Sequence, residues 1–142
     1  MKICVDTVIL IDVLKDEYPE TQDKFYAAIQ QKEKIIISTI TAAELLPQFH
    51  GNKRLLQSFL KDHGIELVGV DLQTSLVGAE RWMKYLKRKK MKRCPSCRAI
   101  LPGREKILPD FLIGGCALVH SEKILTRDRG FYRTYFPDLK LL

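Results

Sequence analysis

Four acidic residues stand where short apolar segments of the chain end or where helices begin. They are Asp6, Glu44, Asp110 and Asp128. In an open parallel sheet, ligands bind outside the carboxyl ends of the strands, so we expect these side chains to converge. Carboxylates held that close raise one another's pKa unless cations neutralise them, and hard ions such as Mg²⁺ or Mn²⁺ suit oxygen ligands. The pattern predicts a metal pair of the kind that activates water against a phosphodiester.

Each of these acids also fits a purely structural role. Asp6 fits the N-cap of the helix that follows it, and Asp110 at a helix N-terminus complements the helix dipole. Thr41 and Glu44 fit a capping box, and Asp128 fits an ordinary turn. Taken singly, the structural roles are favoured, so the functional interpretation rests on the four residues together. No histidine or cysteine accompanies them, which argues against zinc at this place.

A strongly basic segment precedes Asp110. Nine basic residues and no acidic one lie between Lys84 and Arg104, which leaves 15 basic and 17 acidic residues elsewhere, a net charge of −2 in a chain of net charge +7. Such asymmetry suggests a partner that is a polyanion, although a solvated helix face is favoured for a basic run taken alone. Six side chains are the candidates for contacting the backbone of such a partner: Lys87, Arg88, Lys89, Lys90, Lys92 and Arg93. The alternatives are a solvated helix end or a dock for an acidic partner.

Cys94 and Cys97 form a CxxC pair within this basic segment. Such a pair is typical of half a zinc site, and a complete site needs two further ligands. Neither Cys4 nor Cys116 is expected to reach it, since both are predicted to be buried. A local disulfide or a reduced pair is therefore favoured over Zn²⁺ within one chain, although two copies meeting at a two-fold axis would supply four sulfurs.

The elements that must position these residues alternate between short β-type runs and longer helical ones. Strands are predicted at 2–6, 35–38, 65–70, 123–126 and 139–142, and helices to about 15, then at 19–32, 41–49, 53–62, from 71 onward, at 111–119 and at 131–136. This alternation predicts an α/β fold with a central parallel sheet of about four or five strands, flanked by helices on both faces. The 142 residues fit a single domain, with a basic CxxC-containing insert at about 87–107.

Three further expectations concern packing. The Gly114-Gly115 pair is predicted to let another backbone approach closely. Apolar residues that step by four and three predict the core stripe of the long helix: Leu72, Leu76, Ala79, Met83 and Leu86. A second apolar group exceeds what a small core needs and is predicted to form part of a two-fold interface: Leu45, Leu46, Phe49, Leu55, Leu56 and Phe59.

Four segments together resemble a PIN domain, of the kind found in VapC-type toxins and in RNA-processing nucleases. They are ICVDT at 3–7, TITAAEL at 39–45, PDFLI at 109–113 and LTRDRGF at 125–131, and their order and spacing cover nearly the whole chain. The resemblance implies a metal-dependent endoribonuclease, toxin-like and held in check by an antitoxin protein. It also implies that the four acids are the catalytic and metal-binding residues and that the chain forms a homodimer. With RNA as the substrate, the six basic side chains at 87–93 are predicted to position the RNA backbone.

Two positions depart from the family pattern. Val8 stands where the family usually has a small polar residue, and Gly130 stands where a second aspartate often follows Asp128. Both changes remove polar groups near the expected metals, so the alternative is a PIN-fold RNA-processing or RNA-binding subunit with weak or no cleavage. A small phosphatase or receiver domain is disfavoured, because Val5 occupies the place where a receiver has a second acidic residue beside Asp6.

The chain is expected to be cytoplasmic and to have no membrane partner. A membrane span needs about 18 consecutive apolar residues, and no run in the sequence approaches that length. Asp6 and Asp12 interrupt the apolar stretch near the N-terminus, which argues against a secretion signal.

Overall fold

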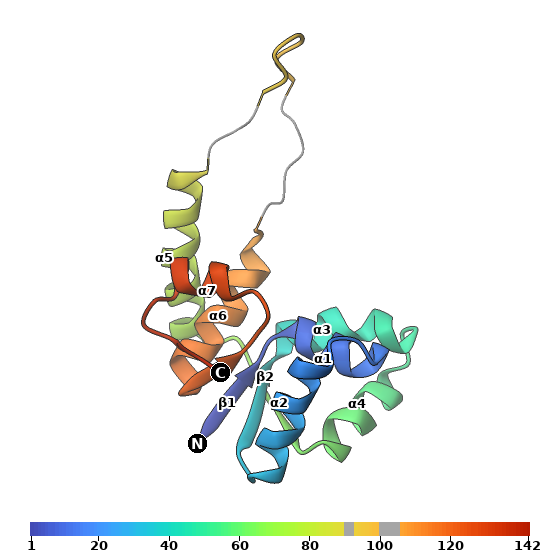
Figure 1. Cartoon of the computed structure of the whole chain (residues 1–142). Helices are drawn as coiled ribbons and strands as arrows, with labels where there is room; N and C mark the ends of the chain where they lie inside the picture. Colours follow the sequence, from blue (N-terminus) through green and yellow to red (C-terminus); the bar gives the residue numbers. More distant parts are fainter. Residues whose placement is uncertain (90–92, 100–105) are drawn as a thin grey trace.

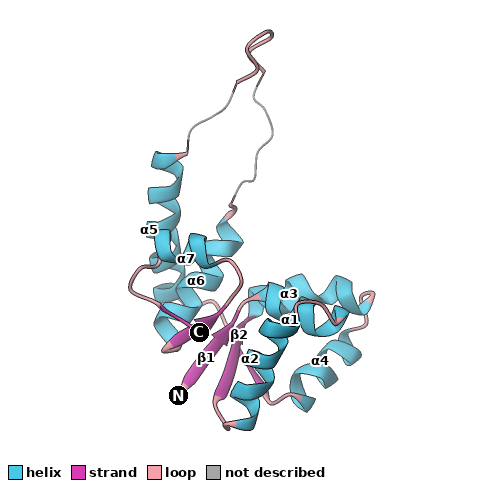
Figure 2. Ribbon diagram, viewed as in Figure 1, coloured by secondary structure: helices cyan, strands magenta, loops and turns pink. Residues whose placement is uncertain are grey.

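Five parallel strands form one sheet in the order β3-β2-β1-β4-β5 in the computed structural model. The structure describes residues 1–89, 93–99 and 106–142. The strands are β1 (Lys2–Val5), β2 (Lys34–Ser38), β3 (Ile65–Val68), β4 (Lys123–Leu125) and β5 (Lys140–Leu141). The predicted parallel α/β sheet is therefore confirmed, and Figure 2 shows its strands between the two groups of helices.

Helices cover both faces of this sheet. They are α1 (Thr7–Lys15), α2 (Pro19–Gln30), α3 (Thr39–Leu45), the 3-10 turn η1 (Leu46–Phe49), α4 (Lys53–Asp62), α5 (Leu72–Arg88), α6 (Leu108–His120) and α7 (Arg129–Tyr135). The first four α-helices lie on one side of the sheet and the last three on the other (Figure 1). Alternation along β1 divides the core accordingly, since Ile3 and Val5 pack with the first group and Cys4 with the second. Cys4 and Cys116 are both buried, as predicted.

Among the helices within the described ranges, none is long and apolar enough to cross a membrane.

Glycines allow α5 and α6 to approach each other backbone to backbone. A Cβ atom added to Gly115 would lie 2.7 Å from the carbonyl oxygen of Thr74, and one added to Gly78 would lie 2.8 Å from that of Phe111. The close approach predicted for the Gly114-Gly115 pair is thus confirmed at Gly115, whereas Gly114 makes room for the ring of Phe136. This contact fixes α5 against α6, the helix that carries Asp110.

The predicted core stripe of α5 is wrong. Its members Leu72, Leu76, Met83 and Leu86 are 74%, 59%, 54% and 46% exposed. The residues that α5 buries most deeply are Thr74 and Gly78, with Trp82 and Tyr85 packed partly against the core. The reason is the backbone contact with α6, which needs small residues at the interface and so turns the apolar stripe toward solvent.

Much of the apolar group predicted to be surplus on α3, η1 and α4 belongs to the core, and the two-fold interface predicted there stays a prediction. Leu45 and Leu56 are buried in the core, and Leu46, Phe49 and Phe59 pack against it. The rings of the two phenylalanines lie 5.6 Å apart. Of the six residues only Leu55, 55% exposed, is an exposed large apolar side chain. The apolar residues of these short helices pack over the β2–β3 side of the sheet. The broadest exposed apolar surface among the described residues lies on α5.

Candidate active site

The four predicted acids line one pocket at the carboxyl end of the sheet. It has a volume of about 150 Å³, and Asp6, Glu44, Asp110 and Asp128 all contribute to its wall. The remaining lining residues are Thr7, Val8, Ile11, Lys106, Ile113, Phe131 and Tyr132. The pocket lies where chain connections leave β1 in one direction and β4 in the other, which is the usual place for a ligand in an open parallel sheet.

Asp6 lies at the centre of this arrangement, directly after β1. Its backbone N–H donates to the carbonyl of Leu125 at 3.0 Å, which continues the pairing with β4. Its side chain caps α1, as the structural interpretation predicted, because Oδ1 accepts the N–H of Thr7 at 2.8 Å. The other carboxylate oxygen accepts the hydroxyl of Thr126 at 2.7 Å. Asp6 is therefore held at both oxygens and is only 9% exposed.

The pKa of Asp6 is raised to about 6. Burial is the largest cause, and the charges of Asp110 and Asp128 raise it further. The hydrogen bonds from Thr126 and from the backbone of Thr7 lower it and so offset part of the effect. A carboxyl group whose pKa responds to two other carboxylates must lie close to both, so the raised pKa reflects the convergence of these acids.

Glu44 reaches the pocket from α3 by a route that the sequence did not predict. Ser38 caps this helix with its side chain, so α3 begins early and Glu44 falls in the second turn rather than the first. The predicted capping box with Thr41 is therefore wrong, and the Glu44 Oε1 atom instead accepts the hydroxyl of Thr7 at 2.9 Å. The pKa of Glu44 is raised, first by burial and then by the charge of Asp110, against the lowering effect of the Thr7 hydrogen bond.

Asp110 and Asp128 come from the other side of the sheet. Asp110 lies in the first turn of α6, where its Oδ2 atom accepts the N–H of Ile107 at 3.0 Å, consistent with its predicted place at a helix start. Asp128 precedes α7, and its backbone N–H donates to the hydroxyl oxygen of Thr126 at 3.0 Å. The carboxylate of Asp128 forms an ion pair with the ammonium group of Lys106.

The donor set of the pocket fits a hard divalent cation. All four acids offer carboxylate oxygens, the ligands that Mg²⁺ and Mn²⁺ prefer. Burial and then neighbouring carboxylates raise the pKa of Asp6 and Glu44, and a bound cation would favour the charged form of both. In the ranges that the structure describes, no three acidic, histidine or cysteine side chains are close enough to hold a metal as they stand. Each carboxylate accepts a bond from a protein donor, so a bound cation would draw the carboxylates together and exchange some of these contacts.

Several residues that build the site were not predicted. Thr7 and Thr126 orient three of the acids through their hydroxyl groups. Asp12, only 1% exposed, accepts the Arg127 Nε–H at 2.7 Å and so ties α1 to the loop that carries Asp128. The acids whose carboxylates these hydroxyls bind are distant in sequence, since Thr7 donates to Glu44 and Thr126 donates to Asp6, so no local pattern pointed to either contact. Lys106 lies beyond the dense basic run, so no pattern in the sequence singled it out.

The two departures from the family pattern have different surroundings. Val8 lines the pocket, so an apolar side chain does replace a polar one at the wall of the site. A Cβ atom at Gly130 would meet nothing within 4 Å, so there is room at this position for a side chain that this chain lacks.

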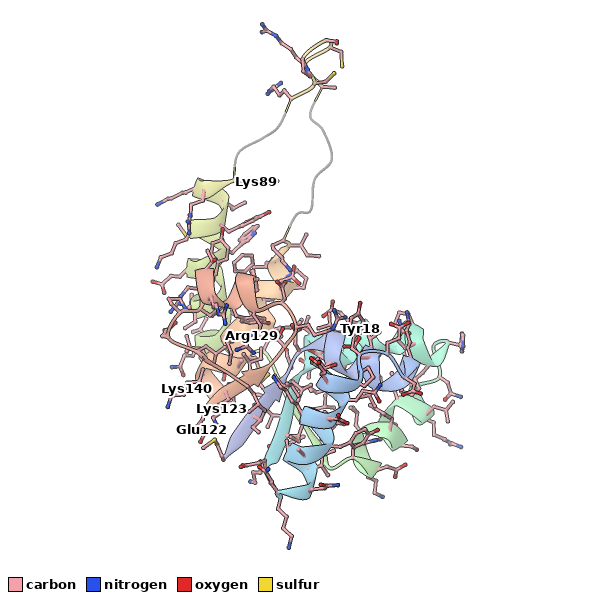
Figure 3. The ribbon with its side chains drawn as sticks, in the orientation of Figure 1. Tyr18, Lys89, Glu122, Lys123, Arg129 and Lys140 are labelled. Atoms are coloured by element: carbon pink, nitrogen blue, oxygen red, sulfur yellow. The ribbon has the colours of Figure 1, made fainter. Side chains whose placement is uncertain are left out.

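The basic segment begins at the end of α5. Lys87 and Arg88 are exposed in its last turn, and Lys89 follows them (Figure 3). Lys90 and Lys92 lie outside the described residues. The predicted role of these side chains in binding RNA stays a prediction.

The CxxC pair forms a tight turn. The N–H of Arg98 donates to the carbonyl of Cys94 at 2.9 Å, and the side chain of Arg93 donates to the carbonyl of Arg98 at 3.2 Å. Both thiols, Cys94 and Cys97, are free. Backbone N–H groups of Cys97 and Ser96 lower the pKa of the Cys94 thiol. The zinc half-site stays a prediction.

The sequence matches the PIN domain family model over residues 3–137. This span includes β2, β3, β4, all but the first residue of β1, and all four acids of the pocket, whereas β5 lies beyond it. The chain therefore belongs to the PIN domain family, whose nucleases generally use divalent metal ions.

Several solved structures share this fold, among them a toxin–antitoxin complex from Klebsiella pneumoniae with a TM-score of 0.52 and 21% identity over 92% of this chain and 89% of that one. One is VapBC2 from Rickettsia felis bound to a DNA fragment from its promoter, with a TM-score of 0.69 and 17% identity over 100% of this chain and 98% of that one. Another is FitAcB from Neisseria gonorrhoeae, with a TM-score of 0.68 and 20% identity over 99% and 96%. VapBC-1 from nontypeable Haemophilus influenzae has a TM-score of 0.66 and 19% identity over 100% and 97%. A search of curated proteins gave no match.

The pKa of Asp6 predicts how the stability of the metal-free protein depends on pH. Since this pKa is about 6 in the folded chain and 3.8 for an unperturbed aspartic acid, ionisation of Asp6 destabilises the fold as pH rises from about 4 to 6 and stays unfavourable above that. In EDTA at pH 8, Asp6→Asn should raise the free energy of unfolding by about 1–3 kcal/mol, and the gain should vanish near pH 4.

Urea unfolding at both pH values measures this effect. Glu20→Gln, which removes an exposed carboxylate from α2, serves as the control and should change little at either pH. A gain for Asp6→Asn that is the same at pH 4 and pH 8 would contradict the assignment of the raised pKa to Asp6.

Proposed function

We propose that this protein is a metal-dependent endoribonuclease that hydrolyses RNA phosphodiester bonds with Mg²⁺ or Mn²⁺. The observation that carries the proposal is the convergence of four carboxylates on one pocket, two of them with raised pKa values. Membership of the PIN domain family supports a nuclease. The basic segment that precedes Asp110 in the sequence favours a nucleic acid as the substrate, and RNA is our choice within that class.

The acids of the pocket would bind the metal, and neighbouring threonines orient these acids. A divalent ion, when bound, supplies a Lewis acid that polarises the phosphate and lowers the pKa of water. Asp6, Glu44, Asp110 and Asp128 would hold it, and of these Asp6 is the most firmly placed, with hydrogen bonds at both oxygens. Threonine hydroxyls aim the carboxylates, so their orientation does not depend on the metal alone.

An apolar wall limits the access of bulk water to the acids. The pocket wall includes Val8, Ile11, Ile113 and Phe131 beside the carboxylates. Charge interactions with the substrate and the metal are stronger where such side chains displace water. A small pocket with this lining suits a single phosphate group rather than a whole base.

We further propose that the protein is toxin-like and binds an antitoxin protein. The support is the fold shared with VapBC2, VapBC-1, FitAcB and the toxin–antitoxin complex from Klebsiella pneumoniae. The alternative is an RNA-processing or RNA-binding subunit with weak cleavage, and the observation that favours it is the apolar Val8 in the wall of the pocket.

The homodimer is also a proposal, and we place its interface on α5. Leu72, Leu76, Ala79, Met83 and Leu86 follow one another by four, three, four and three residues, the spacing of a helix seam that packs against a second helix. Since four of these side chains are at least 46% exposed, the stripe has no cover within the described chain. A second copy presents the same stripe and matches it by symmetry.

Cleavage assays test the proposed function. Wild-type protein should cut a structured RNA in Mg²⁺ or Mn²⁺ and not in EDTA, and Asp6→Asn or Asp110→Asn should slow cleavage by about 100-fold or more, since each removes a metal ligand. Asp62→Asn, at the end of α4, is the control and should cut at the wild-type rate. Full activity of Asp110→Asn, or cleavage in EDTA, would overturn the proposal, and RNA binding without cleavage would favour the alternative.

The salt dependence of RNA binding tests the role of the basic segment. Each phosphate contact on a single strand contributes a slope of roughly −0.7 to the logarithmic salt dependence of the binding constant. In an Asp6→Asn background that prevents cleavage, Lys87→Glu with Lys89→Glu should weaken binding to all RNA sequences and flatten the slope. Lys53→Glu with Lys61→Glu, exposed on α4, makes the same charge change as a control. Equal slopes for the two double variants would mean that RNA binds elsewhere.

Sedimentation velocity tests the proposed dimer. At micromolar concentration the wild type should sediment as a dimer, and Leu76→Glu with Met83→Glu should sediment as a folded monomer, since both side chains are exposed and charge at the seam opposes association. Leu55→Glu, an exposed leucine on α4, is the control and should remain dimeric. A monomeric wild type, or a monomer produced only by the control, would contradict the proposal.

A further inference from the structure

Lys106 is the one basic side chain among the described residues that line the acidic pocket. Its ammonium group forms an ion pair with the carboxylate of Asp128 and lies 4.8 Å from the centre of the Phe131 ring. Ion pairing and a cation–π contact thus hold the same charge at the wall of the pocket.

The backbone of Lys106 is also fixed at this place. Its N–H donates to the hydroxyl of Tyr85 on α5 at 3.0 Å. The Tyr85 ring packs against Phe111 on α6 and Tyr135 on α7, with ring centres 5.6 and 5.7 Å away. An aromatic cluster that joins three helices therefore places Lys106, and the ammonium group reaches the pocket from an anchored residue.

The position of this charge matters because of what surrounds it. Four carboxylates line the pocket, and their negative charges repel one another. A cation at Asp128 reduces that repulsion. A divalent ion that uses Asp128 as a ligand must compete with Lys106 for the same carboxylate, and the ammonium also repels the incoming ion.

We infer that Lys106 is a built-in counter-cation of the acidic pocket, which occupies Asp128 when no metal is bound and lowers the affinity of the pocket for divalent ions. The inference rests on the proposed metal-dependent function and adds a positioning residue to it. Lys106 stands at the end of the basic CxxC-containing segment, two residues before α6, so it links that segment to the chemistry of the pocket. Metal affinity in this protein is then set partly by a side chain that is not a ligand.

Titration with Mn²⁺ in the absence of RNA tests this inference. Isothermal calorimetry on Lys106→Met, which keeps the aliphatic stem and removes the charge, should show Mn²⁺ binding about twofold to tenfold tighter than in the wild type. Lys106→Arg restores a cation and should return the affinity toward the wild-type value. Since RNA is absent, any contact of Lys106 with the substrate does not enter the result.

Two controls make the result specific. Lys140→Met removes an exposed lysine of β5, at the amino end of the sheet (Figure 3), and should leave Mn²⁺ affinity unchanged. Circular dichroism in EDTA checks that each variant is folded. Unchanged or weaker Mn²⁺ binding by folded Lys106→Met would overturn the role of Lys106 alone. Failure of both wild type and variant to bind Mn²⁺ would overturn the metal site, and this inference with it.

Discussion

Burial of a carboxylate among other carboxylates at one edge of the sheet is the constraint on which the rest of the structure depends. The pKa of Asp6, near 6, records the cost, which comes first from burial and then from the charges of Asp110 and Asp128. A fold keeps such a cluster only if other contacts offset this cost. Here the offset comes from hydroxyl and backbone donors and from Lys106. The negative charge that these donors and Lys106 do not neutralise makes the pocket suitable for a divalent ion.

The parallel sheet explains how acids from four distant parts of the chain reach one place. Each βα connection leaves the sheet at the same edge, and the order β3-β2-β1-β4-β5 puts β1 beside β4 in the middle. Asp6 and Asp128 follow those two strands, and the side chain of Thr126 joins them. The helices that carry Glu44 and Asp110 come from opposite faces. The backbone contact between α5 and α6 at Gly78 and Gly115 then holds the second of these helices in place.

Much of the fold and the site could be predicted from the sequence, because both depend on local signals. The β-branched runs at 35–38 and 123–126 predicted strands, and the acids that follow strands predicted the shared edge. The face that α5 buries could not be predicted from hydropathy, since its contact is made by Thr74 and Gly78 while Leu76 and Met83 remain exposed. Lys106 was missed for a related reason: its role comes from tertiary placement by Tyr85, which no spacing in the sequence encodes.

Cleavage of an RNA with sulfur in place of one nonbridging oxygen at the cut site tests the central claim most directly, because it asks whether a metal held by the carboxylates acts on that phosphate. Mg²⁺ is a hard ion that binds sulfur poorly, whereas Mn²⁺ accepts softer ligands. We predict that one of the two phosphorothioate isomers is cut slowly in Mg²⁺ and that Mn²⁺ restores its cleavage. Equal rates for the oxygen and sulfur substrates in both ions, with cleavage that persists in EDTA, would contradict a metal-dependent mechanism at this pocket.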